Sequence, residues 1–175
     1  EAHRLTVESI EEALLLLLKE QPLSALTVTD IAKKAGVSRA AFYRNYASKE
    51  DVLRSIALRH AEEMYTQMRR FRDDPDRAHF WIGLFSYARA HGDFYPLLAG
   101  NATDSLISEC TEYIVTQMSV HPDGICKYVL SYMIGAASRV FEDWVSGGMV
   151  ESPEEMAEFL KKATMGDGAP LSSCH

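Results

Sequence analysis

Residues 27 to 49, TVTDIAKKAGVSRAAFYRNYASK, contain two short helical patterns separated by one glycine, and this stretch restricts the fold more than any other part of the chain. Thr27 and Asp30 have the spacing of a capping box, which marks the start of the first helix. Gly36 comes where the chain must leave that helix with a positive φ. Ser38 is a favoured N-cap residue for the second helix. Two short helices joined by so tight a turn form a helix-turn-helix unit.

The second helix of this unit has an inner and an outer face. Phe42 and Tyr46 are four residues apart and therefore point to the same side, where they can reach the interior. The outer face then carries cationic, small and hydroxyl-bearing side chains, which are Arg39, Ala40, Tyr43 and Arg44. In a helix-turn-helix unit the second helix enters the major groove, with its N-terminal residues against base edges. The pattern therefore predicts binding to duplex DNA.

The net charge of −7 does not exclude DNA as a partner, because only the charge at the contact surface matters. Residues 27 to 49 contain one acidic residue, Asp30, and five basic ones, which are Lys33, Lys34, Arg39, Arg44 and Lys49. Positive charge is thus concentrated in the helix-turn-helix unit, and the acidic remainder limits nonspecific binding to nucleic acid. Lys33 and Lys34 also fit the solvated face of an ordinary helix.

The composition is typical of a cytosolic globular protein. The chain has 175 residues, of which 47% are hydrophobic, so it can bury a sizeable core. Three widely spaced cysteines, Cys110, Cys126 and Cys174, favour a reducing compartment over a disulfide framework. The longest apolar run, residues 13–18, is too short to cross a bilayer, and the sequence opens without a charged and then apolar leader. We therefore expect a cytoplasmic protein that does not enter a membrane.

Apolar residues recur at helical spacing along most of the chain, and no segment alternates polar and apolar residues as a half-buried strand would. We therefore predict an all-α fold. The expected helices span residues 10–18, 28–35, 39–46, 48–71, 79–91, 104–118, 128–145 and 152–162. Residues 73–76, with Pro75, are expected to break the chain between two helical layers, and residues 93–101, with Pro96, to be irregular.

Residues 27 to 53, TVTDIAKKAGVSRAAFYRNYASKEDVL, resemble the DNA-binding segment of the TetR family of bacterial transcriptional regulators almost throughout. With the leucine-rich helix before it, the resemblance covers roughly the first third of the chain. It implies a homodimer in which an N-terminal three-helix domain binds palindromic operator DNA and a larger helical domain binds a small effector. We place the DNA-binding domain at 1–47, the effector-binding and dimerisation domain at 48–165, and a flexible tail at 166–175.

The resemblance also implies roles for individual residues. The family's phosphate-contacting tyrosine and lysine match Tyr43 and Lys49, and its variable base-reading positions match Thr29, Arg39, Ala40 and Arg44. The complete predicted DNA-binding set is Thr27, Thr29, Ser38, Arg39, Ala40, Tyr43, Arg44 and Lys49. Thr27 and Ser38 are needed as helix caps with or without DNA. A basic arm that often precedes the first helix in the family is nearly absent here, with only Arg4 present.

Lys49 stands at the start of the predicted helix 48–71. A cation at a helix N-terminus is unfavourable for the helix by itself, so an anion such as a DNA phosphate in front of Lys49 would explain its position. A solvated lysine is the alternative.

Four aromatic side chains of the larger domain are candidates for an effector pocket: Trp81, Phe85, Tyr128 and Tyr132. Pockets between bundle helices are lined by such residues, although ordinary core packing explains each of them as well. Because this wall offers rings and hydroxyls but few charges, the expected effector is apolar or aromatic with one or two polar groups. No metal site and no cofactor are predicted, because no local ligand spacing links the scattered candidates His91, Cys110, His121 and Cys126.

The helix 128–145 is the most apolar one and is expected to be buried on two sides. Its small residues at 135–138 would let a partner helix approach closely, and the last helix has an apolar stripe of its own. These two helices are therefore the predicted dimer interface, with four candidate residues: Ala137, Phe141, Trp144 and Phe159.

Together these patterns favour a transcriptional repressor that a small effector releases from its operator. A coactivator or other protein-partner module with the same fold is an alternative, and it would be favoured by loss of Arg39, Tyr43 or Lys49, all of which are present. A small helical ligand-binding protein or enzyme is a third class. Paired carboxylates, a nucleophile motif and a phosphate-binding loop are not recognisable in the sequence, so we predict that the protein is not an enzyme.

Overall fold

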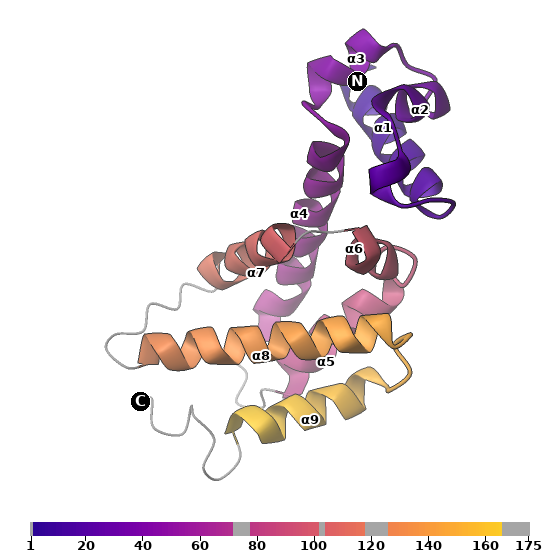
Figure 1. Cartoon of the computed structure of the whole chain (residues 1–175). Coiled ribbons are helices and arrows are strands. Elements are labelled where there is room, and N and C mark those ends of the chain that lie inside the picture. The colour runs from indigo at the N-terminus through magenta and orange to yellow at the C-terminus, as the bar shows by residue number, and fades with distance from the viewer. Residues whose placement is uncertain (1, 72–77, 102–103, 118–125, 166–175) are drawn as a thin grey trace.

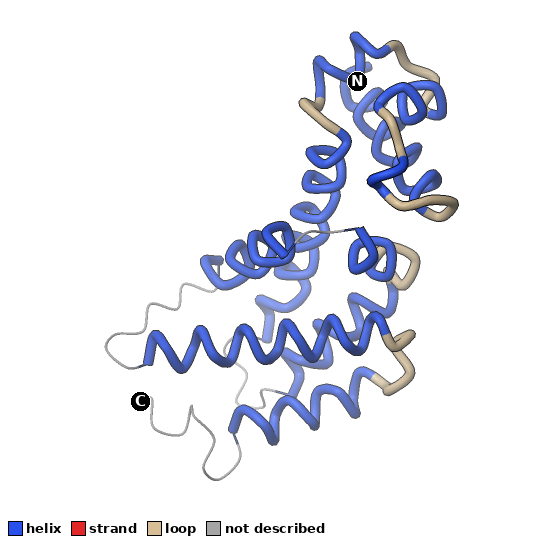
Figure 2. Tube along the Cα trace, viewed as in Figure 1, coloured by secondary structure: helices blue, strands red, loops and turns tan. Residues whose placement is uncertain are grey.

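The computed structural model describes residues 2–71, 78–101, 104–117 and 126–165, and within these ranges all regular structure is helical, as predicted (Figures 1 and 2). The helices are α1 (Ala2–Leu18), η1 (Leu23–Ala25), α2 (Val28–Lys34), α3 (Arg39–Asn45), α4 (Lys49–Met68), η2 (Arg69–Phe71), α5 (Ala78–Ala90), α6 (Tyr95–Asn101), α7 (Asp104–Gln117), α8 (Cys126–Ser146) and α9 (Pro153–Met165). Among the described helices, none has both the length and the apolar character needed to cross a bilayer. The predicted break at 73–76 and the predicted tail at 166–175 lie outside the described residues.

Figure 1 shows two groups of helices joined by one long helix. Helices α1, α2 and α3 form a small group at the top of the view, and α5 to α9 form a larger group below it. Helix α4 leaves the small group and packs against α5 and α7 in the larger one. Helix α5 also packs along α9, and α6 packs against α8. Helix α4 therefore belongs to both groups.

The small group is held together by the apolar stripe of α1. Ile10, Leu14 and Leu18 are buried, as their spacing predicts, and α1 packs against α2 and α4. Full burial of each such side chain stabilises the fold by about 1.5–3 kcal/mol. The helix ends at Leu18, ahead of Pro22.

The predicted caps and turn of the helix-turn-helix unit are present. The hydroxyl of Thr27 accepts a hydrogen bond from the backbone N–H of Asp30 at 3.2 Å, and the Asp30 carboxylate accepts one from the backbone N–H of Thr27 at 2.9 Å. Gly36 has a φ of +67°, and a Cβ at this position would meet no atom within 4 Å, so the backbone conformation and not crowding requires glycine. Ser38 caps α3 by accepting from the N–H of Ala41 at 3.1 Å.

Several predicted boundaries differ from the structure. Helix α1 begins at Ala2, eight residues before the expected start at residue 10, and α9 continues to Met165, beyond the expected end at residue 162. Helix α4 ends at Met68, and the predicted end at Phe71 is reached through the tighter turn η2. Residues 95–101, predicted to be irregular, form α6. Pro96 is compatible with this helix because it lies in the first turn, where a missing N–H removes no helical hydrogen bond. Burial of Phe94 and Tyr95 holds this part of the chain against the core.

The side chain of Glu11 on α1 is a carboxylate in the interior, where the residue is 4% exposed. Its Oε2 accepts from Nη1 of Arg59 on α4 at 2.6 Å, and its Oε1 accepts from the hydroxyl of Tyr46, directly after α3, at 2.8 Å. Burial, with a contribution from the hydrogen bond to Glu11, raises the pKa of Tyr46 to about 12, so the phenol remains a donor at neutral pH. This carboxylate joins α1, the end of α3 and α4.

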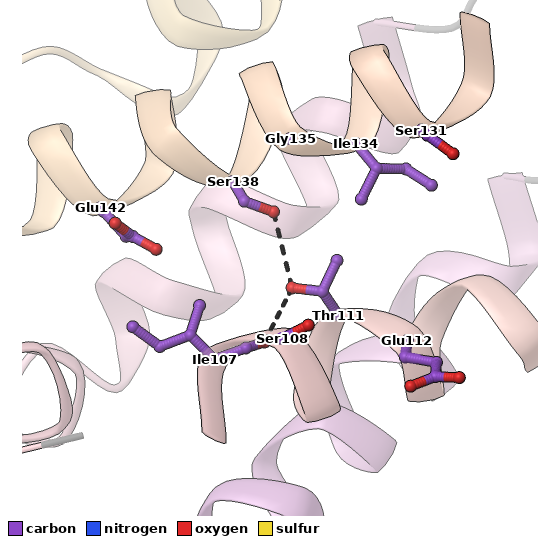
Figure 3. Close-up of a pocket in the computed structure, with 9 residues that line it drawn as sticks. All are labelled: Ile107, Ser108, Thr111, Glu112, Ser131, Ile134, Gly135, Ser138 and Glu142. Carbon is purple, nitrogen blue, oxygen red and sulfur yellow. Dashed lines mark hydrogen bonds between the residues drawn. The ribbon is translucent and has the colours of Figure 1, made fainter. Parts of the chain in front are cut away.

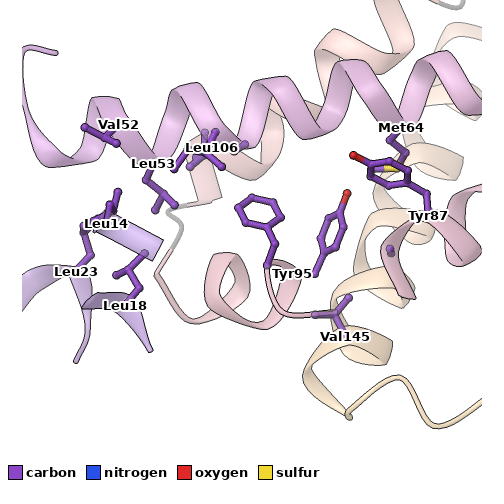
Figure 4. Close-up of a cluster of buried hydrophobic side chains, with 14 of the residues drawn as sticks. Leu14, Leu18, Leu23, Val52, Leu53, Met64, Tyr87, Tyr95, Leu106 and Val145 are labelled. Atoms are coloured by element: carbon purple, nitrogen blue, oxygen red, sulfur yellow. The ribbon is translucent and has the colours of Figure 1, made fainter. Parts of the chain in front are cut away.

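The apolar core is continuous between the two groups. Figure 4 shows Leu14, Leu18 and Leu23 on one side of α4 and Tyr95 and Val145 farther along it, within a single cluster of buried residues. In the larger group, Phe85 is fully buried and meets the ring of Trp144 edge-on, with 5.0 Å between the ring centres. The two groups are therefore not separated by solvent along α4.

The prediction that α8 is buried on two sides is wrong for this chain. Met133, Trp144 and Val145 face the core, whereas Tyr128 and Tyr132 are 62% and 65% exposed. The apolar residues of α8 are spread around the helix, but α6 and the core cover one side of it only. The opposite side keeps large aromatic surface in contact with solvent.

Candidate functional site

The outer face of α3 carries four of the predicted DNA-contacting residues, and all four are exposed: Arg39, Ala40, Tyr43 and Arg44. The inner residues Phe42 and Tyr46 are buried, as predicted. The Tyr43 ring is edge-on to Phe42, with 5.5 Å between the ring centres, and the guanidinium carbon of Arg39 lies 5.9 Å from the centre of the Tyr43 ring. The buried side of the helix thus fixes the orientation of the side chains on its outer face.

The hydroxyl-bearing candidates have different local roles. The Thr27 hydroxyl donates to Oδ2 of Asp30 at 2.6 Å, and this hydrogen bond is the main reason that the pKa of Asp30 is lowered. Ser38 is the N-cap of α3, whereas Thr29 is simply exposed on the first turn of α2. Thr27 and Ser38 therefore have structural roles already, and contact of all three residues with DNA stays a prediction.

Lys49 is neither a free, solvated lysine nor directed away from the protein toward an anion in the structure. Its ammonium donates to the backbone carbonyls of Leu23 and Leu26, each at 2.7 Å, and its side chain is 19% exposed. The positive charge thus lies against two carbonyl oxygens of the loop around η1. These oxygens offset the unfavourable effect of a cation at the N-terminus of α4. Glu50 and Asp51 in the first turn are favourable for the helix dipole. The predicted phosphate contact of Lys49 is not tested by this arrangement.

Basic side chains are exposed on both helices of the unit. Lys33 and Lys34 lie in the last turn of α2, where cations are favourable for the helix dipole, and Arg39 and Arg44 lie on α3. The acidic residue of this stretch, Asp30, is engaged in the cap of α2. An anionic polymer that approaches α3 therefore meets mainly positive charge.

The predicted aromatic effector wall is not formed. Phe85 is fully buried in the core and Trp81 is half-buried, with its ring edge-on to Phe80, whereas Tyr128 and Tyr132 are on the exposed part of α8. The reason is again that apolar residues surround α8, so helical spacing alone does not tell which of them face inward.

A groove instead lies between α7 and α8, with a volume of about 520 Å³ (Figure 3). Its lining residues are mainly polar or small: Ile107, Ser108, Thr111 and Glu112 on α7, and Ser131, Ile134, Gly135, Ser138 and Glu142 on α8. The hydroxyl of Thr111 donates to the carbonyl of Ile107 at 2.9 Å and lies 3.5 Å from that of Ser138. The sequence signal was the series of small residues at positions 131, 135 and 138, which share one face of α8.

Helix α7 is bonded to α4 at two places. Nε of Arg54 donates to the carboxylate of Glu109 at 2.9 Å, and the hydroxyl of Tyr65 donates to the carbonyl of Gln117 at 2.8 Å. One wall of the groove is therefore attached to the helix that leads to the helix-turn-helix unit.

The predicted dimer-interface residues do not share one surface. Trp144 is buried, and Phe141 packs inward against Phe85 and Tyr95, so both belong to the core of the chain. Ala137 is half-buried against the same core. Phe159 on α9 is 54% exposed and is the one of the four that presents a large apolar surface.

Two family models of transcriptional regulators match this chain. Residues 3–56 match the family model of bacterial regulatory proteins of the tetR family, and residues 78–166, about half of the chain, match a model of the C-terminal region of such transcriptional regulators. The chain is 35% identical over 60 residues to the uncharacterized HTH-type transcriptional regulator YxbF of Bacillus subtilis. The aligned region covers 34% of this chain and 16% of YxbF. It is also 35% identical over 68 residues to the HTH-type transcriptional regulator EthR of Mycobacterium tuberculosis, covering 37% of this chain and 32% of EthR.

Solved structures show the same fold over most of the chain. The TetR family repressor AlkX from a Dietzia strain is similar with a TM-score of 0.53 and 19% identity, over 88% of this chain and 90% of AlkX. The dihydroxyacetone kinase operon activator DhaS is similar with a TM-score of 0.55 and 15% identity, over 89% of this chain and 91% of DhaS. The curated relatives are matched over a third of their length or less, whereas the two family models cover both groups of helices. On these grounds the chain belongs to the TetR family of bacterial transcriptional regulators.

Proposed function

We propose that this chain is a sequence-specific transcriptional repressor that binds palindromic operator DNA as a homodimer and is released by a small effector. The observation that carries the proposal is the outer face of α3, where Arg39, Ala40, Tyr43 and Arg44 are exposed on a helix anchored by buried Phe42. Helix α3 is the recognition helix in this proposal. Work on operator DNA implies a cytoplasmic location, and we propose no enzyme activity.

Within this proposal, the recognition helix enters the major groove with its N-terminal end leading. Arg39 is its first residue, and a guanidinium in this position can bond both acceptors of a guanine edge. Tyr43 is one turn later and fits a contact with the phosphate backbone. The exposed lysines of α2 add attraction that does not depend on sequence.

The first prediction separates base reading from phosphate contact. Arg39→Ala should weaken binding to the preferred operator by about 1–3 kcal/mol and relax the preference at one base pair of each half-site. Tyr43→Phe should weaken preferred and random DNA by the same factor, because a phosphate contact carries no sequence information. Selection of bound sequences from random duplexes, followed by affinity measurements at fixed salt, gives both quantities.

Lys19→Ala is the matched control for Arg39→Ala. It removes one positive charge from a surface ion pair with Asp93, directly after α1 and outside the helix-turn-helix unit, and should leave the sequence profile unchanged. An Arg39→Ala variant with the wild-type profile and affinity would contradict the docking. A wild-type protein without affinity for any duplex would favour the protein-partner module instead.

The proposed dimer uses surface that the chain leaves uncovered. Tyr132 on α8 is 65% exposed and Phe159 on α9 is 54% exposed, and such aromatic residues are enriched at the centres of interfaces. Ala136, one residue after the exposed Gly135, would let a helix approach closely. We therefore move the proposed interface from the inward residues Phe141 and Trp144 to the outward side of the same helices.

The second prediction tests this interface. Tyr132→Glu combined with Phe159→Glu should give a monomer by sedimentation velocity, because two charges would be buried without partners at the centre of the contact. The monomer should bind a single half-site and lose the gain from holding two half-sites at once. Leu16→Glu, which places the same charge on an exposed apolar residue of α1, should remain a dimer. An intact dimer of the double variant would place the interface elsewhere.

The groove between α7 and α8 is the proposed effector site. Glu112 and Glu142 contribute carboxylates, several serine and threonine residues contribute hydroxyls, and two isoleucines contribute apolar surface. An effector with a cationic or hydrogen-bond-donating group on an apolar body would match this lining better than a purely aromatic compound. The bonds from α7 to Arg54 and Tyr65 give a bound molecule a physical connection to α4.

The third prediction concerns coupling between effector and operator. A compound found by screening for operator release should bind operator-bound protein more weakly by about 1–3 kcal/mol, which is the same factor by which it weakens DNA binding. Ser138→Leu should fill the groove and abolish the response without changing operator affinity. Ser86→Leu is the control, because Ser86 on α5 lines a separate hollow next to the end of α4 and η2. Equal compound affinity with and without operator would contradict this mechanism, and a compound that strengthens DNA binding would contradict release.

A further inference from the structure

Two histidines and a glutamate lie close together where α4 meets the end of α5. His60 and Glu63 are three residues apart on α4 and therefore share one face of it, and His91 directly follows α5. One ring nitrogen of each histidine and one carboxylate oxygen of Glu63 all lie within 4.8 Å of one another. Three side chains of the types that bind transition metals thus meet at one point.

Tyr87 on α5 orients all three side chains. Its hydroxyl donates to Oε2 of Glu63 at 2.8 Å, so Nδ1 of His60, 3.0 Å from the same hydroxyl oxygen, is the donor in that second contact. Nδ1 of His91 lies 2.9 Å from the backbone carbonyl of Tyr87 and must also carry a proton. These hydrogen bonds leave the lone pair of each ring on Nε2. Metal-binding histidines in proteins are held by the same kind of second contact.

The rings of the cluster are held in place by packing. His60 stacks on Phe94 with 4.0 Å between ring centres and an angle of 14° between planes, and His91 lies 4.1 Å from the ring of Tyr87. Glu63 is exposed and both histidines are half-buried, so an ion can reach them from solvent.

A second, independent observation is the hydroxyl of Tyr95. It is buried and has no hydrogen-bond partner within the described structure, although its ring centre is only 6.2 Å from that of His60. Figure 4 shows Tyr87 and Tyr95 side by side beneath α4. A buried hydroxyl without a partner is costly, and an ion with bound water at the cluster would bring a partner to it.

We propose that His60, Glu63 and His91 bind a divalent transition-metal ion such as Zn²⁺, with water in the remaining coordination positions. Two imidazoles and one carboxylate are a ligand set for zinc, cobalt or nickel and not for magnesium or calcium, which require oxygen ligands. Binding requires the three ligand atoms to draw together from their present spacing, because metal–ligand distances are about 2.0–2.2 Å. The ion would fasten α4 to the end of α5. This inference does not depend on DNA binding.

The sequence alone does not indicate this site, because two of its ligands lie on α4 and the third directly follows α5. The other scattered candidates of the sequence, Cys110, His121 and Cys126, do not include His60, which is 31 positions before His91 in the chain. The pair His60 and Glu63 is a one-turn spacing that also fits an ordinary exposed helix face.

The fourth prediction tests the site with metal ions alone. The full chain, treated with a chelator and then freed of it, should bind one Co²⁺ per chain with visible d–d absorption of a low-symmetry site, and Zn²⁺ should displace the cobalt. His91→Gln should abolish this spectrum. Glu63→Gln, which keeps an acceptor for Tyr87, should weaken Co²⁺ binding by about tenfold or more, and Tyr87→Phe by about 10–100-fold, because it removes the contact that orients the ligands.

His79→Gln is the matched control, because it removes an exposed histidine from the same helix, α5, outside the cluster. It should leave the spectrum and the affinity unchanged. Far-UV circular dichroism of each variant shows whether its helices are intact. Because Glu63 is exposed, Glu63→Gln should stay folded and still tests the site if His91→Gln unfolds. Wild-type protein without Co²⁺ absorption, or a Glu63→Gln variant with wild-type affinity and spectrum, would overturn the proposal.

Discussion

The buried carboxylate of Glu11 is the contact on which the position of the recognition helix depends. A carboxylate in the interior is costly unless its oxygens are hydrogen-bonded, and here the bonds come from Tyr46 and Arg59. The three groups lie on α1, at the end of α3 and on α4, so these helices must keep one relative position for the charge to be compensated. Phe42, four residues before Tyr46, is buried in the same core. The exposed face of α3 is therefore fixed with respect to α4.

Helix α4 then carries contacts to each neighbouring element in turn. Lys49 bonds the loop around η1, Arg54 bonds Glu109 on α7, and His60 contacts Tyr87 on α5. The α7–α8 groove, through α7, and the histidine cluster thus both contact the helix that follows the recognition helix. A ligand at either place can alter DNA binding only to the extent that it prefers one position of α4 over another. The proposed regulation rests on this physical connection.

Local backbone features were predictable from the sequence because their causes are local. The cap residues Thr27 and Ser38 and the positive φ of Gly36 follow from side-chain hydrogen bonding and sterics within a few residues. The all-α fold and the inward position of Phe42 follow from helical spacing. The family resemblance rested on the same stretch and was confirmed by the two family models.

Features that depend on which helices meet were not predictable in the same way. Apolar residues surround α8, so its spacing did not separate the buried Trp144 from the exposed Tyr132. The expected aromatic wall therefore used exposed residues of α8, and the expected interface used residues of α8 that face the core. The bonds of Lys49 to two loop carbonyls and the meeting of His60 with His91 are contacts between segments distant in the sequence. Only the packed fold brings such groups together.

The most direct test of this account is native-state hydrogen exchange on wild-type protein and on Tyr46→Phe, which removes one hydrogen bond from the buried carboxylate. The free energy of opening should fall by about 1.5–3 kcal/mol for the amides of α3 and by the same amount for those in the first half of α4, because the account makes them one cooperative unit. Faster exchange in α3 with unchanged exchange in the first half of α4 would contradict it, since the recognition helix would then move independently of the helix proposed to control it.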